Sequence, residues 1–383
     1  MKTDIAIIGG GLAGLTAAIS ANRMGHSVVL IEKKEYPFHK VCGEYISLEA
    51  IHLLRWLGLP IEEWKLPILN SFRITHPETK DFYSKLPLGG IGISRYKLDA
   101  VLKSIAEKEG VTILQNTKVE TLENKDNLFL LKTNQFEVPE IVGKVVLGAF
   151  GRNKPHFANE KPEETSSPKG FIGVKMHVLA DLPKDRIELH YFPGGYCGIS
   201  AIEGNKYCLC YLIDAQSVKL EKGDLEKVEN HILSKNPELN RYLNDFEKVT
   251  ERVSTAGVFF SPRSLSQNGM LFIGDSAGMI PPLAGNGMSM AMHAAIIAVE
   301  EANLLLTGKV NSLEMVRNYQ SRWMRQFDGR LKTARTLQSI MQTNFATRLS
   351  LQIFNLAPPL FKLAAKATHG VEIPIPDFAW QKN

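Results

Sequence analysis

The sequence predicts a mixed α/β protein with a parallel β-sheet, an inserted antiparallel sheet and a C-terminal helical region. Apolar runs at residues 5–8 and 28–31 flank a helical pattern that ends at Gly25, which is the order of a β-α-β unit. Residues 170–214 alternate between apolar and polar side chains, as antiparallel strands do. Residues 309–383 place many apolar side chains at helical spacing.

The turn of the β-α-β unit is rich in glycine and reads IAIIGGGLAG. Gly9 permits a tight turn, Gly11 lets the backbone approach a pyrophosphate, and Gly14 lets the helix pack against the strand. Glu32 closes the next strand, where a carboxylate can accept hydrogen bonds from a ribose. Because strand, turn, helix, strand and acid occur in this order, the segment predicts a dinucleotide site that also includes Ala13.

A second glycine-rich segment, GMLFIGDSAGMIPPLAGNGM, covers residues 269–288. Its short apolar strand, 270–273, ends at an acid that is placed to bind the ribityl or phosphate arm of a flavin. The helical pattern from about 288 to 306 follows, and its N-terminal amides can stabilise negative charge on a reduced flavin. The two segments together favour FAD. We expect cofactor contacts from Gly274, Asp275, Gly285, Asn286, Gly287 and Met288.

With these motifs, residues 3–310 resemble flavoproteins of the p-hydroxybenzoate hydroxylase fold, which include aromatic monooxygenases, geranylgeranyl reductases and flavin-dependent halogenases. The resemblance implies a GR2-type Rossmann-like FAD-binding domain, and it implies that Arg95 in SRYKLDAVL also binds FAD. An Asp-Gly pair of the family is replaced here by residues 149–152, AFGR. This weakens the case for a regulated nicotinamide site, so NAD(P)H is expected only as a transient electron donor.

The segment HKVCGEYIS, residues 39–47, resembles the KPCGG stretch of geranylgeranyl reductases and, without the cysteine, the KVGES stretch of halogenases. In the reductases this cysteine lies close to the flavin ring, so the resemblance makes Cys42 the candidate catalytic residue. The alternative is a small buried hydrophobic side chain. Lys40 and Glu44 flank it, and Lys40 could lower the thiol pKa. The halogenase signature WxWxIP is absent, which disfavours halogenation.

Composition excludes several other classes of protein. The net charge of +5 comes without a basic stripe interleaved with aromatics, so a nucleic-acid partner is not expected. The four cysteines show no paired CxxC spacing, and no His or Cys cluster indicates a metal site. The first strand begins almost at the first residue, which predicts a cytoplasmic protein without a signal peptide. No apolar run reaches the length of a membrane span.

We expect the FAD-binding domain to be discontinuous, with residues 1–75, 90–155 and 265–308. Residues 76–89 and 156–264 would form the substrate domain, and 309–383 the helical region. Within the FAD-binding domain, residues 124–127 predict the turn of a small meander. The simplest construction for the substrate domain is a four-stranded antiparallel sheet, with strands at 170–178, 187–192, 196–202 and 206–214.

The stretch HYFPGGYCG resembles the YxWxFP stretch of geranylgeranyl reductases, with His190 at the first aromatic position. In that family the sheet covers the pocket in front of the flavin. Tyr191, Tyr196, Tyr207 and Tyr211 could therefore contact substrate, although aromatic side chains on a sheet commonly pack into a core.

The tail allows two interpretations. Residues 349–365 are apolar with little charge, and Pro358-Pro359 interrupts them. They could be helices packed on the seam between domains, which is the commoner arrangement, or a peripheral membrane contact. Either would suit a lipophilic substrate.

We expect a flavin oxidoreductase. The first interpretation is an NAD(P)H-driven monooxygenase that acts on a lipophilic, polyketide-like or isoprenoid-like compound with dioxygen. The alternative is a geranylgeranyl reductase-like enzyme that reduces C=C double bonds, with Cys42 at the site. A halogenase or a non-catalytic flavin-binding protein ranks lower. No second GxGxxG provides a nicotinamide domain, so a separate electron donor is also an option.

Overall fold

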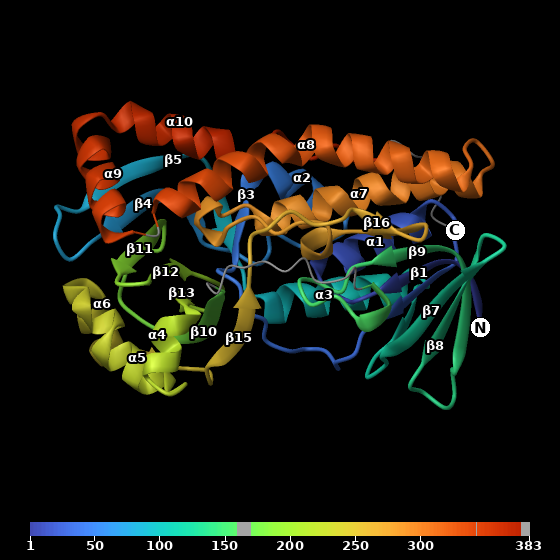
Figure 1. Ribbon diagram of the computed structural model, residues 1–383, viewed down its shortest axis with the longest axis horizontal. Coiled ribbons are helices and arrows are strands. Elements are labelled where there is room, and N and C mark those ends of the chain that lie inside the picture. The colour runs from blue at the N-terminus through green and yellow to red at the C-terminus, as the bar shows by residue number, and fades with distance from the viewer. Residues whose placement is uncertain (159–169, 342, 377–383) are drawn as a thin grey trace.

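The computed structural model describes residues 1–158, 170–341 and 343–376. Two sheets lie at opposite ends of the long axis of the molecule, and helices α7 (Gly287–Leu306) and α8 (Ser312–Ile340) run along one side (Figure 1). The predicted mixed α/β class is therefore confirmed, with a parallel-centred sheet, a second sheet and C-terminal helices.

The first sheet has a parallel centre made from the apolar runs of the sequence. Its strands follow the order β16-β17-β9-β1-β2-β6, and β8 and β7 extend it from β9 as an antiparallel hairpin. The hairpin turns at Asp126 and Asn127, both with positive φ, inside the predicted turn at 124–127. Its strands are β1 Lys2–Ile8, β2 Val28–Ile31, β6 Thr112–Leu114, β7 Val119–Lys125, β8 Leu128–Thr133, β9 Glu140–Gly148, β16 Ser266–Gln267 and β17 Met270–Phe272.

The second sheet is larger than the expected four strands. Its order is β14-β10-β13-β12-β11-β4-β5-β3, and β15 pairs with the outer side of β10. The four predicted strands, β10 to β13, are present at its centre. The bounds are β3 Tyr45–Ser47, β4 Ile68–Thr75, β5 Phe82–Gly92, β10 Phe171–Leu179, β11 Arg186–Phe192, β12 Gly195–Ala201, β13 Lys206–Asp214, β14 Glu247–Lys248 and β15 Val253–Val258.

The four-strand expectation was wrong because the additional strands come from distant parts of the chain. Strand β4 pairs in parallel with β11, more than a hundred residues away, and such a pairing leaves no local sequence pattern. The chain therefore enters the second sheet at β3, and again at Ile68, before the expected domain boundary at residue 75. Strand β5 then continues to Gly92, beyond the expected boundary at residue 89.

The helices cover both sheets. Helix α1 packs against α3 and α7 beside the first sheet, and α10 packs against α8, α9 and β5. Helices α5 and α6 lie beyond the second sheet, on its side away from α8 (Figure 1). The remaining bounds are α1 Leu12–Arg23, α2 Ile51–Trp56, α3 Arg95–Lys108, α4 Ala215–Leu220, α5 Leu225–His231, α6 Pro237–Asp245, α9 Asn344–Leu356 and α10 Pro358–Thr368.

Within the described residues, α7 alone is long and apolar enough to cross a membrane. Of its most apolar stretch, 67% is buried inside the protein. Its inner neighbours are α1 and α8, and its residues belong to the same core as β1 and β9. Helix α7 thus has the length and composition of a membrane span, but it packs as a helix of the protein core.

Candidate flavin and substrate site

The glycine-rich turn has the geometry that a close approach requires. Gly9 has φ +110°, and a Cβ there would clash with the backbone of Ala149. A Cβ on Gly14 would clash with the carbonyl oxygen of Gly9, so the helix packs on the turn as predicted. Gly11 differs, because a Cβ there would meet only Lys40 Nζ at 3.8 Å and Arg95 Nη2 at 4.0 Å. The side of the turn at Gly11 therefore faces two cationic groups.

Those cations are held by an acid that the sequence analysis did not single out. Asp99 accepts two hydrogen bonds of 2.8 Å from Arg95 and one of 2.9 Å from Lys40. Burial raises the pKa of Asp99, but the charges of Arg95 and Lys40 more than offset this and lower it. Two cations with one anion leave a positive charge beside Gly11, which suits a pyrophosphate. The i,i+4 spacing of Arg95 and Asp99 was the available signal.

Glu32 lies at the end of β2, where it was expected. Its carboxylate is buried, and it accepts hydrogen bonds from the backbone N–H of Gly10 at 2.8 Å and of Lys34 at 3.0 Å. It also lines the cavity described below. Glu32 therefore lines the cavity and also holds the glycine-rich turn through Gly10. The position of Glu32 in the sequence does not reveal this second role.

The predicted Gly274-Asp275 segment, which follows β17, lies beside the glycine-rich turn at the start of α1. Gly274 has φ +63°, and a Cβ there would lie 3.0 Å from Cβ of Ala13, so this strand end packs directly on the first turn of α1. Burial raises the pKa of Asp275, with Arg95, Arg263 and Arg152 opposing that rise. Asp275 lines the cavity.

The loop before α7 has an unsatisfied polar group. Gly285 has φ +67°, α7 begins at Gly287, and Met288 is buried in its first turn. Asn286 donates from Nδ2 to the carbonyl of Thr368 at 3.1 Å, which ties the loop to the end of α10. Its Oδ1 is buried without a hydrogen-bond partner among the described residues, and Asn286 lines the cavity. A buried acceptor in this position indicates a ligand donor.

One cavity of about 780 Å³ joins these elements. The cofactor half contains the residues above. The apolar half is lined by side chains of the second sheet and, unexpectedly, of the C-terminal helices. The residues of the apolar half are Phe72, Ile74, Leu86, Ile187, Leu189, Leu212, Leu283, Met341, Phe354 and Phe361. The last three were not predicted from the sequence, because the tail carries no recognised motif.

Cys42 lies in the loop that joins the two halves. Its Sγ accepts a hydrogen bond from Glu44 N at 3.4 Å, and it lines the cavity. Its side chain is half-buried, because the cavity is beside it while protein surrounds the rest. Burial raises the pKa of the Cys42 thiol, and the charge of Arg95 opposes that rise only in part. The expected effect of Lys40 is not found, since Lys40 is paired with Asp99.

Behind Cys42 lies a buried charged cluster. The register of β10 and β13 places Lys175 opposite Cys210 and His177 opposite Cys208, so all four side chains share one face. Glu44 accepts hydrogen bonds from Lys175 at 2.7 Å, from His177 at 2.6 Å and from the backbone N–H of Arg95 at 2.9 Å. Burial raises the pKa of Glu44, but His177 and Lys175 more than offset it and lower it.

This cluster is poorly suited to a metal ion. The ligand atoms of Glu44, His177 and Cys208 lie within 4.8 Å of one another. The Lys175 ammonium, however, already neutralises Glu44 and would repel a cation at that position. The arrangement instead fixes the Cys42 loop to β10 of the second sheet and to the start of α3.

The tyrosines expected near substrate divide between the two faces of the second sheet. Tyr196 lines the cavity, and Tyr191 packs beside it with its hydroxyl 3.4 Å from the sulfur of Met341. Tyr207 and Tyr211 belong to the core beneath α5 and α6, where Tyr211 donates to Glu229. Tyr211 also borders the cavity, so packing alone accounts only for Tyr207.

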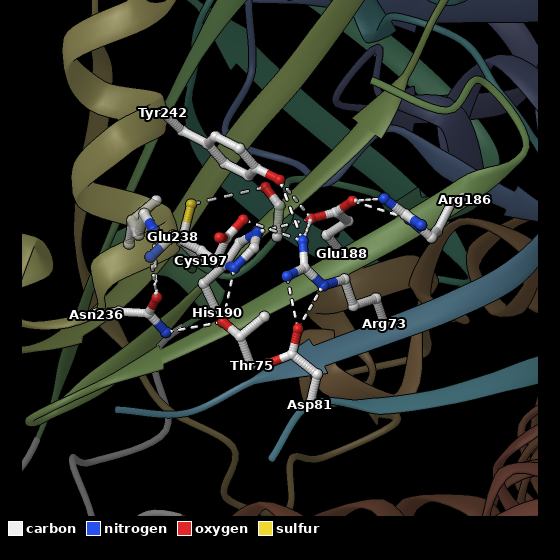
Figure 2. Close-up of polar contacts among 12 residues, drawn as sticks. Arg73, Thr75, Asp81, Arg186, Glu188, His190, Cys197, Asn236, Glu238 and Tyr242 are labelled. Atoms are coloured by element: carbon white, nitrogen blue, oxygen red, sulfur yellow. Dashed lines mark hydrogen bonds and ion pairs between the residues drawn. The ribbon is translucent and has the colours of Figure 1, made fainter. Parts of the chain in front are cut away.

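His190 is not among the described residues that line the cavity. Its Nδ1 lies 2.8 Å from Thr75 Oγ1, and its Nε2 lies 3.4 Å from Glu188. Figure 2 shows it inside a polar network between β4, β11 and α6, with contacts among Arg73, Asp81, Arg186, Glu188, Asn236, Glu238 and Tyr242. The strand alternation explains this, because Leu189 points into the cavity and its neighbours cannot.

Comparison with known proteins agrees with the fold and the cofactor. The family model described as "FAD binding domain" matches residues 2–322. Digeranylgeranylglycerophospholipid reductase 2 of Methanopyrus kandleri is 26% identical over 345 residues, which cover 87% of this chain and 85% of that protein.

Two solved structures share the fold. The flavin-dependent brominase Bmp2 has a TM-score of 0.79 at 21% identity, covering 100% of this chain and 96% of the other. A geranylgeranyl bacteriochlorophyll reductase-like protein of Thermoplasma acidophilum has a TM-score of 0.70 at 17% identity, covering 98% and 94%. With the glycine-rich turn, the Gly-Asp strand end and a family match over most of its length, the chain belongs to the FAD binding domain family of flavoproteins and is an FAD-dependent oxidoreductase.

Proposed function

We propose that this enzyme reduces carbon–carbon double bonds in an isoprenoid-type lipid. The observation that carries the proposal is the position of the Cys42 thiol, which borders the cavity where the cofactor half meets the apolar half. The name of the relative from Methanopyrus kandleri supports a reductase more than the monooxygenase that the sequence analysis placed first.

The residues of the cofactor half suit FAD. The surroundings of Gly11 carry positive charge that would hold a pyrophosphate, and Glu32 lines the cavity and would accept from a ribose. Asn286 Oδ1 is an acceptor without a partner among the described residues. Gly285 and Gly287 leave the start of α7 without side chains. When bound and reduced by two electrons from the donor, FAD would supply the hydride for the reduction.

The chain itself would bind the lipid and provide the proton. The apolar half presents aliphatic and aromatic side chains, which favour a hydrocarbon chain by the hydrophobic effect. Reduction of a C=C bond adds a hydride to one carbon and a proton to the other. Because the pKa of Cys42 is raised, Sγ carries a proton at neutral pH and can donate it. Burial then favours return of a proton to the sulfur.

The electron donor belongs to the same proposal. NAD(P)H acting transiently and a separate reduced protein would both serve, since each needs only to deliver two electrons to the flavin.

The experiment uses FAD-loaded protein reduced with dithionite under anaerobic conditions. Adding a geranylgeranyl glycerol ether in detergent micelles should reoxidise the flavin, seen by absorbance, and yield a lipid with two more hydrogen atoms by mass spectrometry. In air with NADPH, a monooxygenase would instead add an oxygen atom to the lipid. That product, or a flavin that stays reduced under anaerobic conditions, would overturn the proposal.

A further inference from the structure

Helices α9 and α10 expose a row of large apolar side chains. The spacing on α9 is four, four and three residues, so the side chains lie on one side of the helix. Their exposed fractions run from 41% for Ile353 to 87% for Leu356. We call this row the outer face, and it consists of Phe345, Leu349, Ile353, Leu356, Leu360 and Leu363.

The opposite sides of the same helices are also apolar. Phe354, Phe361, Ala364 and Ala365 line the cavity. One helix diameter, about 10 Å, therefore separates the outer face from the proposed substrate space. A helix in water is normally polar on its exposed side, so apolar residues on both sides indicate a second apolar partner.

The charged residues of α9 and α10 themselves all have one sign. Residues 344–368 contain Arg348, Lys362 and Lys366 and no Asp or Glu. Arg348 lies 3.1 Å from Glu78, whereas Lys362 and Lys366 are exposed and form no ion pair among the described residues. With 13 and 11 residues, α9 and α10 are too short to span a bilayer. Short helices with one apolar side and flanking lysines lie flat in a membrane interface.

We propose that the outer face docks on the surface of a lipid bilayer that contains anionic lipids. The inference rests on the proposed lipid substrate, because docking places the bilayer one helix away from the apolar half of the cavity. Leu and Phe side chains would enter the acyl boundary, and Lys362 and Lys366 would meet the headgroups. A bilayer accounts for the basic flanks, which a second copy of this chain, itself positively charged at +5, would not.

The test is flotation of the FAD-loaded protein with vesicles, without any turnover. Wild type should float with vesicles of phosphatidylglycerol and phosphatidylcholine, and less with phosphatidylcholine alone. The double variant L356S/L363S should bind roughly tenfold more weakly, because two largely exposed leucines lose their burial in lipid. The matched control is F136S/L220S, which removes side chains that are 99% and 73% exposed elsewhere, and its binding should not change.

A second double variant tests the contribution of Lys362 and Lys366 to membrane binding. K362Q/K366Q should weaken binding to anionic vesicles by roughly fivefold for each lysine and should leave binding to neutral vesicles unchanged. All variants should keep native FAD content and melting temperature, which excludes misfolding. Absence of flotation, equal loss in both double variants, or a wild-type dimer that L356S/L363S converts to monomer would overturn the proposal. Because no reaction is measured, failure here is distinguishable from failure of the reductase assay.

Discussion

The carboxylate of Glu44 lies 2.7 Å from the ammonium of Lys175, and both side chains are almost completely removed from solvent. Glu44 adopts a left-handed backbone conformation with φ 55°, which is uncommon outside glycine. Its side chain is held by Lys175, His177 and the first amide of α3, so the cluster fixes the backbone that positions Cys42. A charged pair in this place therefore links the second sheet to the flavin-binding domain.

Removing one partner should leave a buried charge uncompensated. We expect Lys175→Met to lower the free energy of unfolding by about 3–5 kcal/mol, measured by urea denaturation. The control is Lys103→Met, which breaks a partly exposed i,i+4 pair with Glu107 and should cost no more than about 1 kcal/mol. A similar small loss in both variants would contradict the role of the pair.

A second prediction concerns acid stability. Burial raises the pKa of Glu188, but the contact with His190 and the nearby Arg186 lower it to about 2, from 4.5. Burial lowers the pKa of His190, so at neutral pH its ring is uncharged and the positive charge near Glu188 comes from Arg186 and Arg73. Glu188 thus stabilises the folded state fully above pH 4.5 and loses this contribution as the pH falls toward 2.

The measurement is unfolding free energy as a function of pH for wild type and Glu188→Gln. Between pH 5 and pH 2, the free energy of unfolding of the variant should fall by up to about 3 kcal/mol less than that of wild type. Glu123→Gln on the exposed β7 should follow the wild-type curve. Parallel curves for wild type and Glu188→Gln would show that another group causes the acid decline.

Local motifs predicted residues that the fold brings together at one cavity. The turn at Gly9 to Gly14, Glu32, and the Gly274-Asp275 strand end meet at one cavity, because each motif encodes its own short-range geometry. The same applies to the β10–β13 strands, whose alternation and turns are local.

The remaining parts depend on contacts between distant segments. The pairing of β4 with β11 and the packing of Phe354 and Phe361 against Phe72 or Phe82 have no periodic signal. Lys175 and His177 lie in an otherwise apolar strand, and they contact Glu44, which is more than a hundred residues away in the chain. The burial of these polar side chains could not be predicted from composition.

A third prediction separates cofactor approach from folding. A Cβ at Gly287 would lie 3.6 Å from Ile280 Cγ2, an ordinary contact, so Gly287→Val should fold with a near-native melting temperature. Its side chain would still occupy the start of α7, and we expect FAD affinity to fall at least about tenfold by fluorescence titration. Gly329→Ala in α8 has open space and should bind FAD normally. Native affinity in Gly287→Val would place the flavin elsewhere.

A fourth prediction tests the apolar half. Ala364→Phe fills cavity space from α10, and we expect weaker binding of a micellar geranylgeranyl lipid with unchanged FAD content. Ala367→Phe carries the same change on an exposed position of the same helix and should bind the lipid normally. The measurement is the lipid concentration that half-saturates flavin reoxidation, and equal values for both variants would argue against this half as the lipid site.

The last prediction is the role of the Cys42 thiol. Cys42→Ser should keep FAD and a near-native melting temperature, because the side chain is only half-buried and borders a cavity. Lipid-driven flavin reoxidation should slow by about a hundredfold or more, which is the usual contribution of a general acid. Cys208→Ser is the matched variant: its thiol is buried behind the loop and donates to the Cys42 carbonyl at 3.3 Å. A serine hydroxyl there should cost about 1–3 kcal/mol of stability and leave the reoxidation rate alone. If Cys42→Ser instead reoxidises at the wild-type rate and melts earlier, the thiol serves packing and the proton comes from another group.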